Sequence, residues 1–590
     1  MIENNELKYS IKAKNDAASL NAANHIRDHI FEATGKNIAV ATVNDDEVVN
    51  SDEYTIFVGC INIASRAGVT LTADTSKGTY LLKSHINNVF LLANNEDGYL
   101  LGAHKFLEKT LGYDHYGRDT YSYDLIADNV DIPYLNEEHT TAFEHRRCDD
   151  TDFTWHDGDE LNYNSGNWNN KNPLVPVDNG QRYHNSTLII KPSEYKNSHP
   201  SWFSLNSSGN LATDPYIQLC YTARGNASEY NALVNLTANK IIDIFANTSD
   251  LSKNTLCFGM GDSASHCYCS ACTSASNSYG GSIAGTVVKF LNDVYSIING
   301  RITETNRDEI FLNFLAYYDY EKAPVGINCS DHVGVIIAPI QANYTEAINS
   351  DSNYEQYGSL FSSWATVCSR IDTWLYETNF QYYLYPLNSF KATTESIRYL
   401  ASLGSVNTIY TQGQHNINAP RTGFTSLKKY LNSKFMDDPT SNYDELVNKF
   451  FANYYGEGGS EMKTFFNEMV SRLEYDEANY VSVLYANNRK TVGQKIDDAR
   501  LWDFNQLKSW VNLCEVAINK TSNETLKKHI LAESIFPRFA LCTLFSNKYS
   551  SSDLLALRSA FKSDCELLGI DKYKEADCSL KTDYFDIWGL

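Results

Sequence analysis

Residues 284–320, AGTVVKFLNDVYSIINGRITETNRDEIFLNFLAYYDY, pair a helix-length amphipathic segment with a short apolar segment that ends in aromatic and acidic residues. Apolar residues recur at helical spacing over 284–300, whereas the run at 309–316 is typical of a buried strand. The same alternation continues in both directions, from about residue 140 to about residue 415. Strands that alternate with helices in this way predict a parallel β/α array.

The array contains enough strands to close a barrel. Eight candidate strands over about 275 residues match the size of a (β/α)8 TIM barrel. We therefore expect such a barrel over residues 136–424. The candidate strands are AFEHRRCDD (142–150), GQRYHNST (180–187), IQLCYTA (217–223), TLCFGMGD (255–262), EIFLNFLAYYDY (309–320), VGVIIAPIQANY (333–344), IDTWLYETNF (371–380) and NTIYTQGQ (407–414).

The segments on either side of the barrel have different patterns. Residues 1–135 combine apolar strand-like runs with two amphipathic helices, at 15–35 and 98–113, which predicts a small N-terminal α/β sandwich domain. After Gly423 the apolar stripes recur at helical spacing, which predicts an α-helical domain over 425–590. The fold class predicted for the whole chain is therefore α/β, with three domains.

Composition and charge exclude several kinds of partner. The formal net charge of −23 argues against nucleic acid, because phosphates would be repelled over most of the surface. No apolar run approaches the ~20 residues that cross a bilayer, so no membrane span is expected. The 40 Tyr and 8 Trp residues suit stacking against sugar rings, but they are equally suited to filling cores and strand faces. The sequence carries no signal for an oligomeric state.

The amino terminus bears on localisation. The first residues, MIENNELKYS, lack the basic and apolar regions of a signal peptide. A secreted chain from which the signal peptide had been removed would look the same. We expect a secreted or cell-surface protein, with the cytoplasm as the alternative.

Polar residues at the carboxyl ends of the predicted strands form the candidate site, because reacting groups of such barrels gather there. Asp262, after the fourth strand, is the candidate general acid if partial burial raises its pKa, although it could instead cap a following helix. Glu377 is its candidate partner, or a solvated loop charge, and Asp319 is a third carboxylate. Carboxylates, amides and aromatic rings suit a neutral sugar better than a phosphate. The candidate substrate-binding residues are Arg146, His184, Tyr317, Gln341, Trp374, Tyr376, Asn379 and Gln412.

Eight motifs follow one another along the chain: FLEKTLGYDHYG (106–117), FSLNSSG (203–209), QLCYT (218–222), GDSASHCYCSAC (261–272), LAYYDYEKAP (315–324), WLYETNFQYYLYPLNSF (374–390), QGQ (412–414) and FFANYYG (450–456). Taken in this order, the series resembles a known family. It is similar to the bacterial alpha-glucuronidase-like proteins, a domain-of-unknown-function family that overlaps glycoside hydrolase family 163, whose activity is endo-β-N-acetylglucosaminidase action on N-glycans. The resemblance extends from residue 1 to about residue 465. The first domain also resembles the non-catalytic domain that precedes the barrel in family 20 hexosaminidases and family 67 glucuronidases.

The resemblance implies a retaining glycoside hydrolase that acts on N-acetylglucosamine-containing or uronic-acid-containing glycans. Asp262 would be the acid/base, and Glu377 or a substrate acetamido group the nucleophile. The family pattern carries acidic residues where this chain has Gln341, Leu375 and Thr411. The alternative is therefore a catalytically inert glycan-binding protein on the same scaffold.

The stretch GMGDSASHCYCSACTS, residues 259–274, offers four soft metal ligands at close spacing, namely His266, Cys267, Cys269 and Cys272. A closed tetrahedral metal site usually takes its ligands from two clusters in the sequence, and no second cluster of ligands follows this one. We expect a structural cross-link that holds this loop, either a bound metal ion or a disulfide. No catalytic cofactor is expected, because glycosidic cleavage uses carboxylates.

Overall fold

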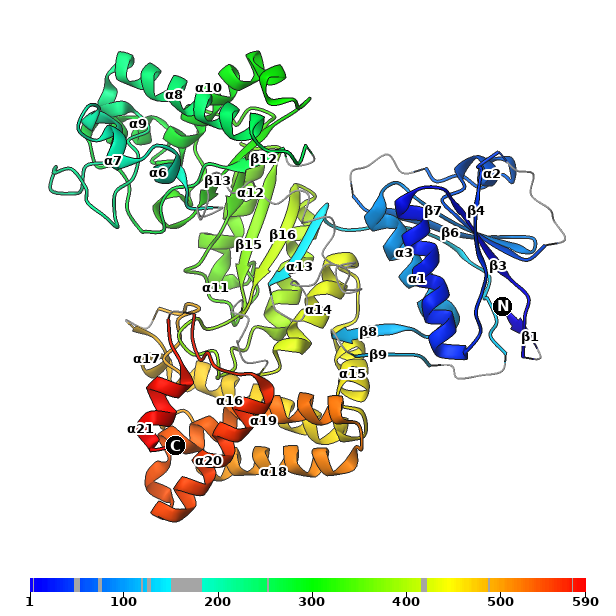
Figure 1. The fold of residues 1–590 in the computed structure, drawn as a ribbon. Helices are drawn as coiled ribbons and strands as arrows, with labels where there is room; N and C mark the ends of the chain where they lie inside the picture. Colours follow the sequence, from blue (N-terminus) through cyan, green and yellow to red (C-terminus); the bar gives the residue numbers. More distant parts are fainter. Residues whose placement is uncertain are drawn as a thin grey trace.

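The structure is a computed structural model that describes residues 1–3, 5–46, 53–72, 77–117, 120–124, 129–149, 183–251, 254–414, 422–486, 489–575 and 577–590. It contains an N-terminal α/β domain, a central parallel sheet with helices, and a helical C-terminal region (Figure 1). The predicted fold class is confirmed at this level. In the described part of the chain, no helix is long and apolar enough to cross a membrane.

The N-terminal domain is built on a six-stranded sheet in the order β10-β6-β7-β5-β3-β4. Helices α1 and α3 pack on one face and the short α2 on the other. Both long helices end at a glycine with left-handed backbone, Gly35 at φ 70° and Gly112 at φ 67°, which stops each helix cleanly. The elements are β3 (Ser10–Lys14), α1 (Ala17–Thr34), β4 (Val40–Val43), β5 (Thr55–Val58), α2 (Ile61–Arg66), β6 (Thr79–His85), β7 (Asn88–Ala93), α3 (Glu96–Leu111) and β10 (Asn136–Thr140).

Two features join this domain to the rest of the chain. Strand β10 pairs antiparallel with β6, so the first sheet continues to Thr140, a few residues past the expected boundary. The hairpin of β8 (Asp114–Gly117) and β9 (Thr120–Ser122) reaches the helical region (Figure 1). There the Tyr430 hydroxyl donates to Asp114 Oδ2 at 2.8 Å, and Lys434 pairs with Asp114 Oδ1 at 2.7 Å.

The central sheet contains six parallel strands in the order β11-β16-β15-β14-β13-β12. The first strand lies beside the last, as barrel closure requires, but β12 ends the sheet at the other side. The sheet is therefore a parallel half-barrel. Its strands are β11 (His145–Asp149), β12 (Thr255–Cys257), β13 (Phe311–Ala316), β14 (Val333–Ile337), β15 (Ile371–Tyr376) and β16 (Val406–Gln412).

The second and third predicted strands do not form as regular strands in the described residues. After Tyr183, the amides of Asn185 and Ser186 donate to the Gly259 carbonyl at 3.1 and 2.9 Å, and helix α6 (Ser186–Ile189) begins at once. A Cβ on Gly259 would lie 1.8 Å from the Tyr183 carbonyl oxygen, so only glycine permits this approach. The third segment forms an isolated antiparallel bridge between Leu219 and Phe203.

Helices cover the outer face of the half-barrel and continue into the C-terminal region. One hydrophobic core extends through both parts, separate from the two cores of the N-terminal domain. The longer helices are α8 (Ala227–Ala246), α9 (Ser270–Ser278), α10 (Ala284–Gly300), α12 (Ser359–Ala365), α13 (Phe390–Leu403), α14 (Thr425–Asp437), α15 (Tyr443–Tyr454), α16 (Gly459–Asn479), α18 (Phe504–Lys520), α19 (Glu524–Leu544) and α20 (Ser551–Leu568).

Candidate active site

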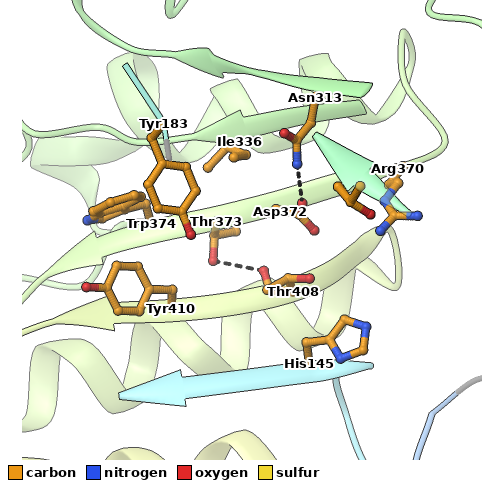
Figure 2. A pocket seen from close by; sticks show the side chains of 11 residues that line it. His145, Tyr183, Asn313, Ile336, Arg370, Asp372, Thr373, Trp374, Thr408 and Tyr410 are labelled. Carbon is orange, nitrogen blue, oxygen red and sulfur yellow. Dashed lines mark hydrogen bonds between the residues drawn. The ribbon is translucent and has the colours of Figure 1, made fainter. Parts of the chain in front are cut away.

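The inner face of the half-barrel lines a small hollow with a cavity volume of about 20 Å³ (Figure 2). Because side chains alternate along a strand, mainly every second residue of each strand faces it, although Thr373 of β15 also contributes to the lining. On β15 these alternating residues are Asp372 and Trp374. Tyr376 comes next toward the carboxyl ends of the strands, and this end of the half-barrel is called the mouth. On β16 they are Thr408 and Tyr410. The lining residues are His145, Tyr183, Thr255, Asn313, Ile336, Arg370, Asp372, Thr373, Trp374, Thr408 and Tyr410.

Aromatic rings gather at the end of the hollow nearest the strands' carboxyl ends (Figure 2). The indole of Trp374 meets the rings of Tyr410 and Tyr183 edge-on, with centroids 4.7 and 4.8 Å away. Its Nε1 donates to Gln412 Oε1 at 2.8 Å. The side chain is half-buried, so one part of the indole is fixed by packing and another stays accessible.

Asp262 lies at the mouth, in the loop after β12, and is exposed. The hydroxyl of Tyr317 donates to its Oδ1 at 3.1 Å, and burial raises the pKa of that tyrosine, which keeps it a donor. The side chain of Gln218 holds the preceding residue, since its Oε1 accepts from the Gly261 amide at 2.9 Å. Asp262 caps no helix, because α9 begins at Ser270 with Cys269 as its N-cap.

Two further predicted residues belong to or contact the segments around Asp262 and Tyr317. His184 is half-buried, with Nδ1 2.9 Å from the Met260 carbonyl and its ring 5.9 Å from that of Tyr317. Asp319 is exposed and pairs with His266, at 2.5 Å between Oδ2 and Nδ1. That ion pair joins the loop after β12 to the turn after β13.

Glu377 does not share this mouth, contrary to the sequence-based expectation. Its side chain is 2% exposed, and its two carboxylate oxygens accept from Lys429 and Asn432 of α14. Tyr376 faces inward, so Glu377 faces outward against the helical region. The expectation failed because the sequence does not show that α14 covers this face.

Arg146 and Asn379 also have structural contacts where substrate contacts were expected. The fully buried guanidinium of Arg146 donates to both oxygens of Asp97 on α3, at 3.0 and 2.8 Å. Asn379 is 1% exposed, and its Nδ2 donates to the Gln494 carbonyl at 2.6 Å. Both residues therefore attach other parts of the chain to the half-barrel.

We expect Arg146→Lys to lower the free energy of unfolding by about 1–3 kcal/mol, because lysine cannot make the paired contacts of the buried guanidinium. Chemical denaturation would measure the loss. Arg27→Lys, at a pair with Asp28 in which the side chains are 35% and 61% exposed, is the matched control and should change stability by less than about 1 kcal/mol. Unchanged stability together with weaker sugar binding would return Arg146 to the substrate site.

The remaining predicted positions differ in their orientation. Gln341 follows β14 and is half-buried. Leu375 and Thr411 are buried on the outer face, where Thr411 Oγ1 accepts from Asn432 at 3.3 Å. Because these two positions lie on the outer face, their differences from the family pattern remove no carboxylate from the inner face.

Glu321 was missed by the sequence-based prediction. It follows the 3-10 turn Tyr318–Tyr320, which Tyr318 enters with left-handed backbone at φ 48°. Glu321 is half-buried, and burial is the largest cause of its raised pKa of about 7, which Arg489 lowers and Asp319, to a smaller extent, raises. Among the described residues, its buried Oε1 has no hydrogen-bond partner. The only sequence signal was a second acidic residue shortly after this strand, and nothing in the sequence distinguished it from Asp319.

The carboxyl group of Glu321 lies near two buried tyrosines, Tyr344 and Tyr376, whose ring centroids are 5.8 Å apart. Burial raises the pKa of Tyr376 well above its ordinary value, and the carboxylates of Asp262 and Glu321 raise it further. Burial likewise raises the pKa of Tyr344, with Glu321 as the next cause. The buried Tyr376 ring therefore lies within electrostatic range of both carboxyl groups.

The family profile described as a domain of unknown function, DUF4838, matches residues 119–467, which is more than half of the chain. The chain belongs to this family. The DUF4838 match spans the half-barrel, both mouth carboxyl groups and the cysteine-rich loop. A comparison with curated proteins finds no match.

Solved structures resemble the chain at the level of fold. A family 89 glycoside hydrolase from Clostridium perfringens superposes with a TM-score of 0.47 at 10% identity, covering 92% of this chain and 65% of that chain. A GH138 enzyme targeting pectin rhamnogalacturonan II gives 0.39 at 9% identity, with 95% and 74% covered. The GH20 β-N-acetylhexosaminidase from Streptomyces coelicolor A3(2) gives 0.34 at 10% identity, with 75% and 90% covered. Similarity of this degree does not extend to site residues or substrates.

Proposed function

We propose that this DUF4838 protein is a glycoside hydrolase whose reacting groups lie at the carboxyl ends of β12 and β13. Glu321 is the general acid, and Asp262 is the carboxylate that stabilises positive charge at the sugar. The observation that carries the proposal is the contrast between the two carboxyl groups, since Asp262 is exposed whereas burial raises the pKa of Glu321 to about 7. Two carboxyl groups in opposite environments supply the acid and the anion of one reaction.

Hydrolysis of a glycosidic bond needs both of these functions. The leaving oxygen must be protonated as the bond breaks, and the oxocarbenium-like sugar must be stabilised by negative charge. A carboxyl group with a pKa near 7 is protonated often enough at neutral pH to donate. Tyr317 holds Asp262 in place through its 3.1 Å hydrogen bond.

The aromatic residues near the mouth support a sugar ligand. Trp374 and Tyr376 face the same interior from β15, and their ring centroids are 6.5 Å apart. An aromatic face buries the apolar C–H surface of a sugar ring, while the rim of amides and hydroxyls satisfies its polar groups. The net charge of −23 favours a neutral sugar over an acidic one. Together with the family resemblance, this supports N-acetylglucosamine-containing glycans as the substrate class.

We expect Trp374→Ala to weaken glycan affinity by about tenfold or more, because the stacking surface is lost. Calorimetric titration with a non-hydrolysed oligosaccharide would measure the change. Trp374→Phe keeps an aromatic face and should retain much of the affinity. If Trp374→Ala instead unfolds while Trp374→Phe binds like the unchanged protein, the indole is a packing residue and this assignment fails.

The proposal is tested by incubating the protein with a panel of neutral N-acetylglucosamine-containing glycans and uronic-acid-containing glycans. Release of reducing ends from the first group is expected. Release from the second group alone would overturn the substrate class. Binding without release from any glycan would favour an inert glycan-binding protein.

A further inference from the structure

A cluster of four thiols lies beside the loop that carries Asp262. Cys220 belongs to the segment that replaces the third strand, Cys267 and Cys269 to the loop after β12, and Cys272 to the first turn of α9. All four are buried, with exposed fractions from 0 to 6%. We propose that these four cysteines bind one structural zinc ion.

The distances between the sulfur atoms suit a shared ion. The four Sγ atoms lie within 4.8 Å of one another. Cys220 Sγ is 3.8 Å from Cys269 Sγ and 3.6 Å from Cys272 Sγ. Four sulfurs at about 2.3 Å from a tetrahedral zinc ion lie about 3.8 Å apart, whereas the sulfurs of a disulfide lie at about 2.05 Å. The separations fit four ligands around one ion.

Backbone amides supply the outer contacts that thiolate ligands need. The Arg224 amide donates to Cys220 Sγ at 3.2 Å, and the Leu205 amide to Cys267 Sγ at 3.4 Å. The Cys272 amide donates to Cys269 Sγ at 3.3 Å. Donors aimed at sulfur stabilise its negative charge and fix its orientation, as second-shell contacts do at metal sites. A packed cluster of neutral thiols would need no such donors.

The ligand set specifies the kind of metal and its role. Four sulfurs and no carboxylate select a soft or borderline ion such as zinc over magnesium or calcium. Four protein ligands complete a tetrahedron and leave no position for substrate, so the ion is structural. His266, the fourth ligand expected from the sequence, instead pairs with Asp319, and Cys220 takes its place.

The position of the cluster explains what the ion would do. The segment that contains Cys220 joins the rest by isolated bridges in the described residues, so no strand ladder holds it against β12. A shared ion would tie this segment to the loop that contains Asp262 and to α9. It would replace the missing third strand as the connection that positions the mouth.

The test is elemental analysis of the full chain, purified under reducing conditions without added metal. We expect about one zinc per chain, and after replacement by cobalt the visible absorption of tetrahedral cobalt thiolate. Cys220→Ser and Cys272→Ser should each remove most of the zinc and lower the melting temperature. Cys565→Ser, at a free buried cysteine of α20, and His266→Ala are the matched controls and should keep the zinc.

Thiol counting on the unchanged protein keeps the proposal testable if the serine variants fail to fold. The structure has eleven free cysteines and one disulfide, Cys329–Cys368. If the four cysteines bind zinc, denaturation in the presence of a chelator should expose eleven reactive thiols. Two disulfides within the cluster would leave seven, which is eleven less four. A count of seven, or eleven thiols with no bound zinc and no cobalt spectrum, would overturn the proposal.

Discussion

Glu321→Gln is expected to lower kcat on a natural glycan by about 100-fold to 10,000-fold, because an amide keeps the shape of the carboxyl group but cannot donate its proton. The pH profile gives a second signature. A general acid must be protonated, so activity of the unchanged protein should fall as the pH rises through about 7, the value to which burial raises this pKa. The variant should lose that limb of the profile.

Stability separates this role from a structural one. Burial raises the pKa of Glu321 from its ordinary value to about 7, so ionisation in the folded state is costly. The unchanged protein should therefore lose stability as the pH rises from about 4.5 to about 7, and Glu321→Gln should not show this loss. Asp319→Asn is the matched control, since it removes an exposed carboxylate of the same turn. An equal loss of activity in both variants would contradict the assignment of the acid to Glu321.

Lys429→Met is expected to destabilise the protein by about 3–5 kcal/mol, because it leaves the Glu377 carboxylate buried without its ion partner. The pair is closed to solvent, with exposed fractions of 0% for Lys429 and 2% for Glu377. Chemical denaturation would measure the effect. The double variant Lys429→Met, Glu377→Gln should recover much of the loss, since no unpaired charge remains.

A surface ion pair provides the control for that experiment. Lys289 and Asp293 are one turn apart on α10 and are 50% and 34% exposed. Lys289→Met should cost less than about 1 kcal/mol, because water screens the pair. If Lys429→Met were equally mild but abolished hydrolysis, Glu377 would belong to the catalytic site after all.

Local patterns in the sequence predicted the elements and the inward-facing aromatic residues. Apolar periodicity located the six strands of the half-barrel, and Gly35 marked the end of α1. The alternation of side chains places Trp374 and Tyr376 on one face of β15, as expected for residues that line a hollow. These features depend on neighbours in the chain, which the sequence shows directly.

Features that depend on distant contacts could not be predicted. Arg146, Glu377 and Asn379 were expected at the mouth, but α3, α14 and the segment around Gln494 cover them. The second predicted strand fails because the chain turns back onto Gly259. Burial alone distinguishes Glu321 from Asp319, and burial is a property of the fold.

Cys220 illustrates the same limit for the cysteine cluster. Its sequence separation from Cys269 is 49 residues, and no repeated spacing connects the two. The nearby His266 was the more obvious ligand from its position beside Cys267. The structure shows which side chains converge, because it brings the segment of Cys220 against the loop after β12.

The most direct test of the proposed hydrolase compares two substrates for the unchanged protein, Glu321→Gln and Asp262→Asn. One substrate is a natural N-acetylglucosamine-containing glycan, and the other is its nitrophenyl glycoside, whose leaving group hardly needs protonation. We predict that Glu321→Gln loses kcat/KM mainly on the natural glycan, whereas Asp262→Asn loses it equally on both, because charge at the sugar is needed in either case. Absence of hydrolysis of both substrates by the unchanged protein, or an equal loss on both in Glu321→Gln, would contradict the account.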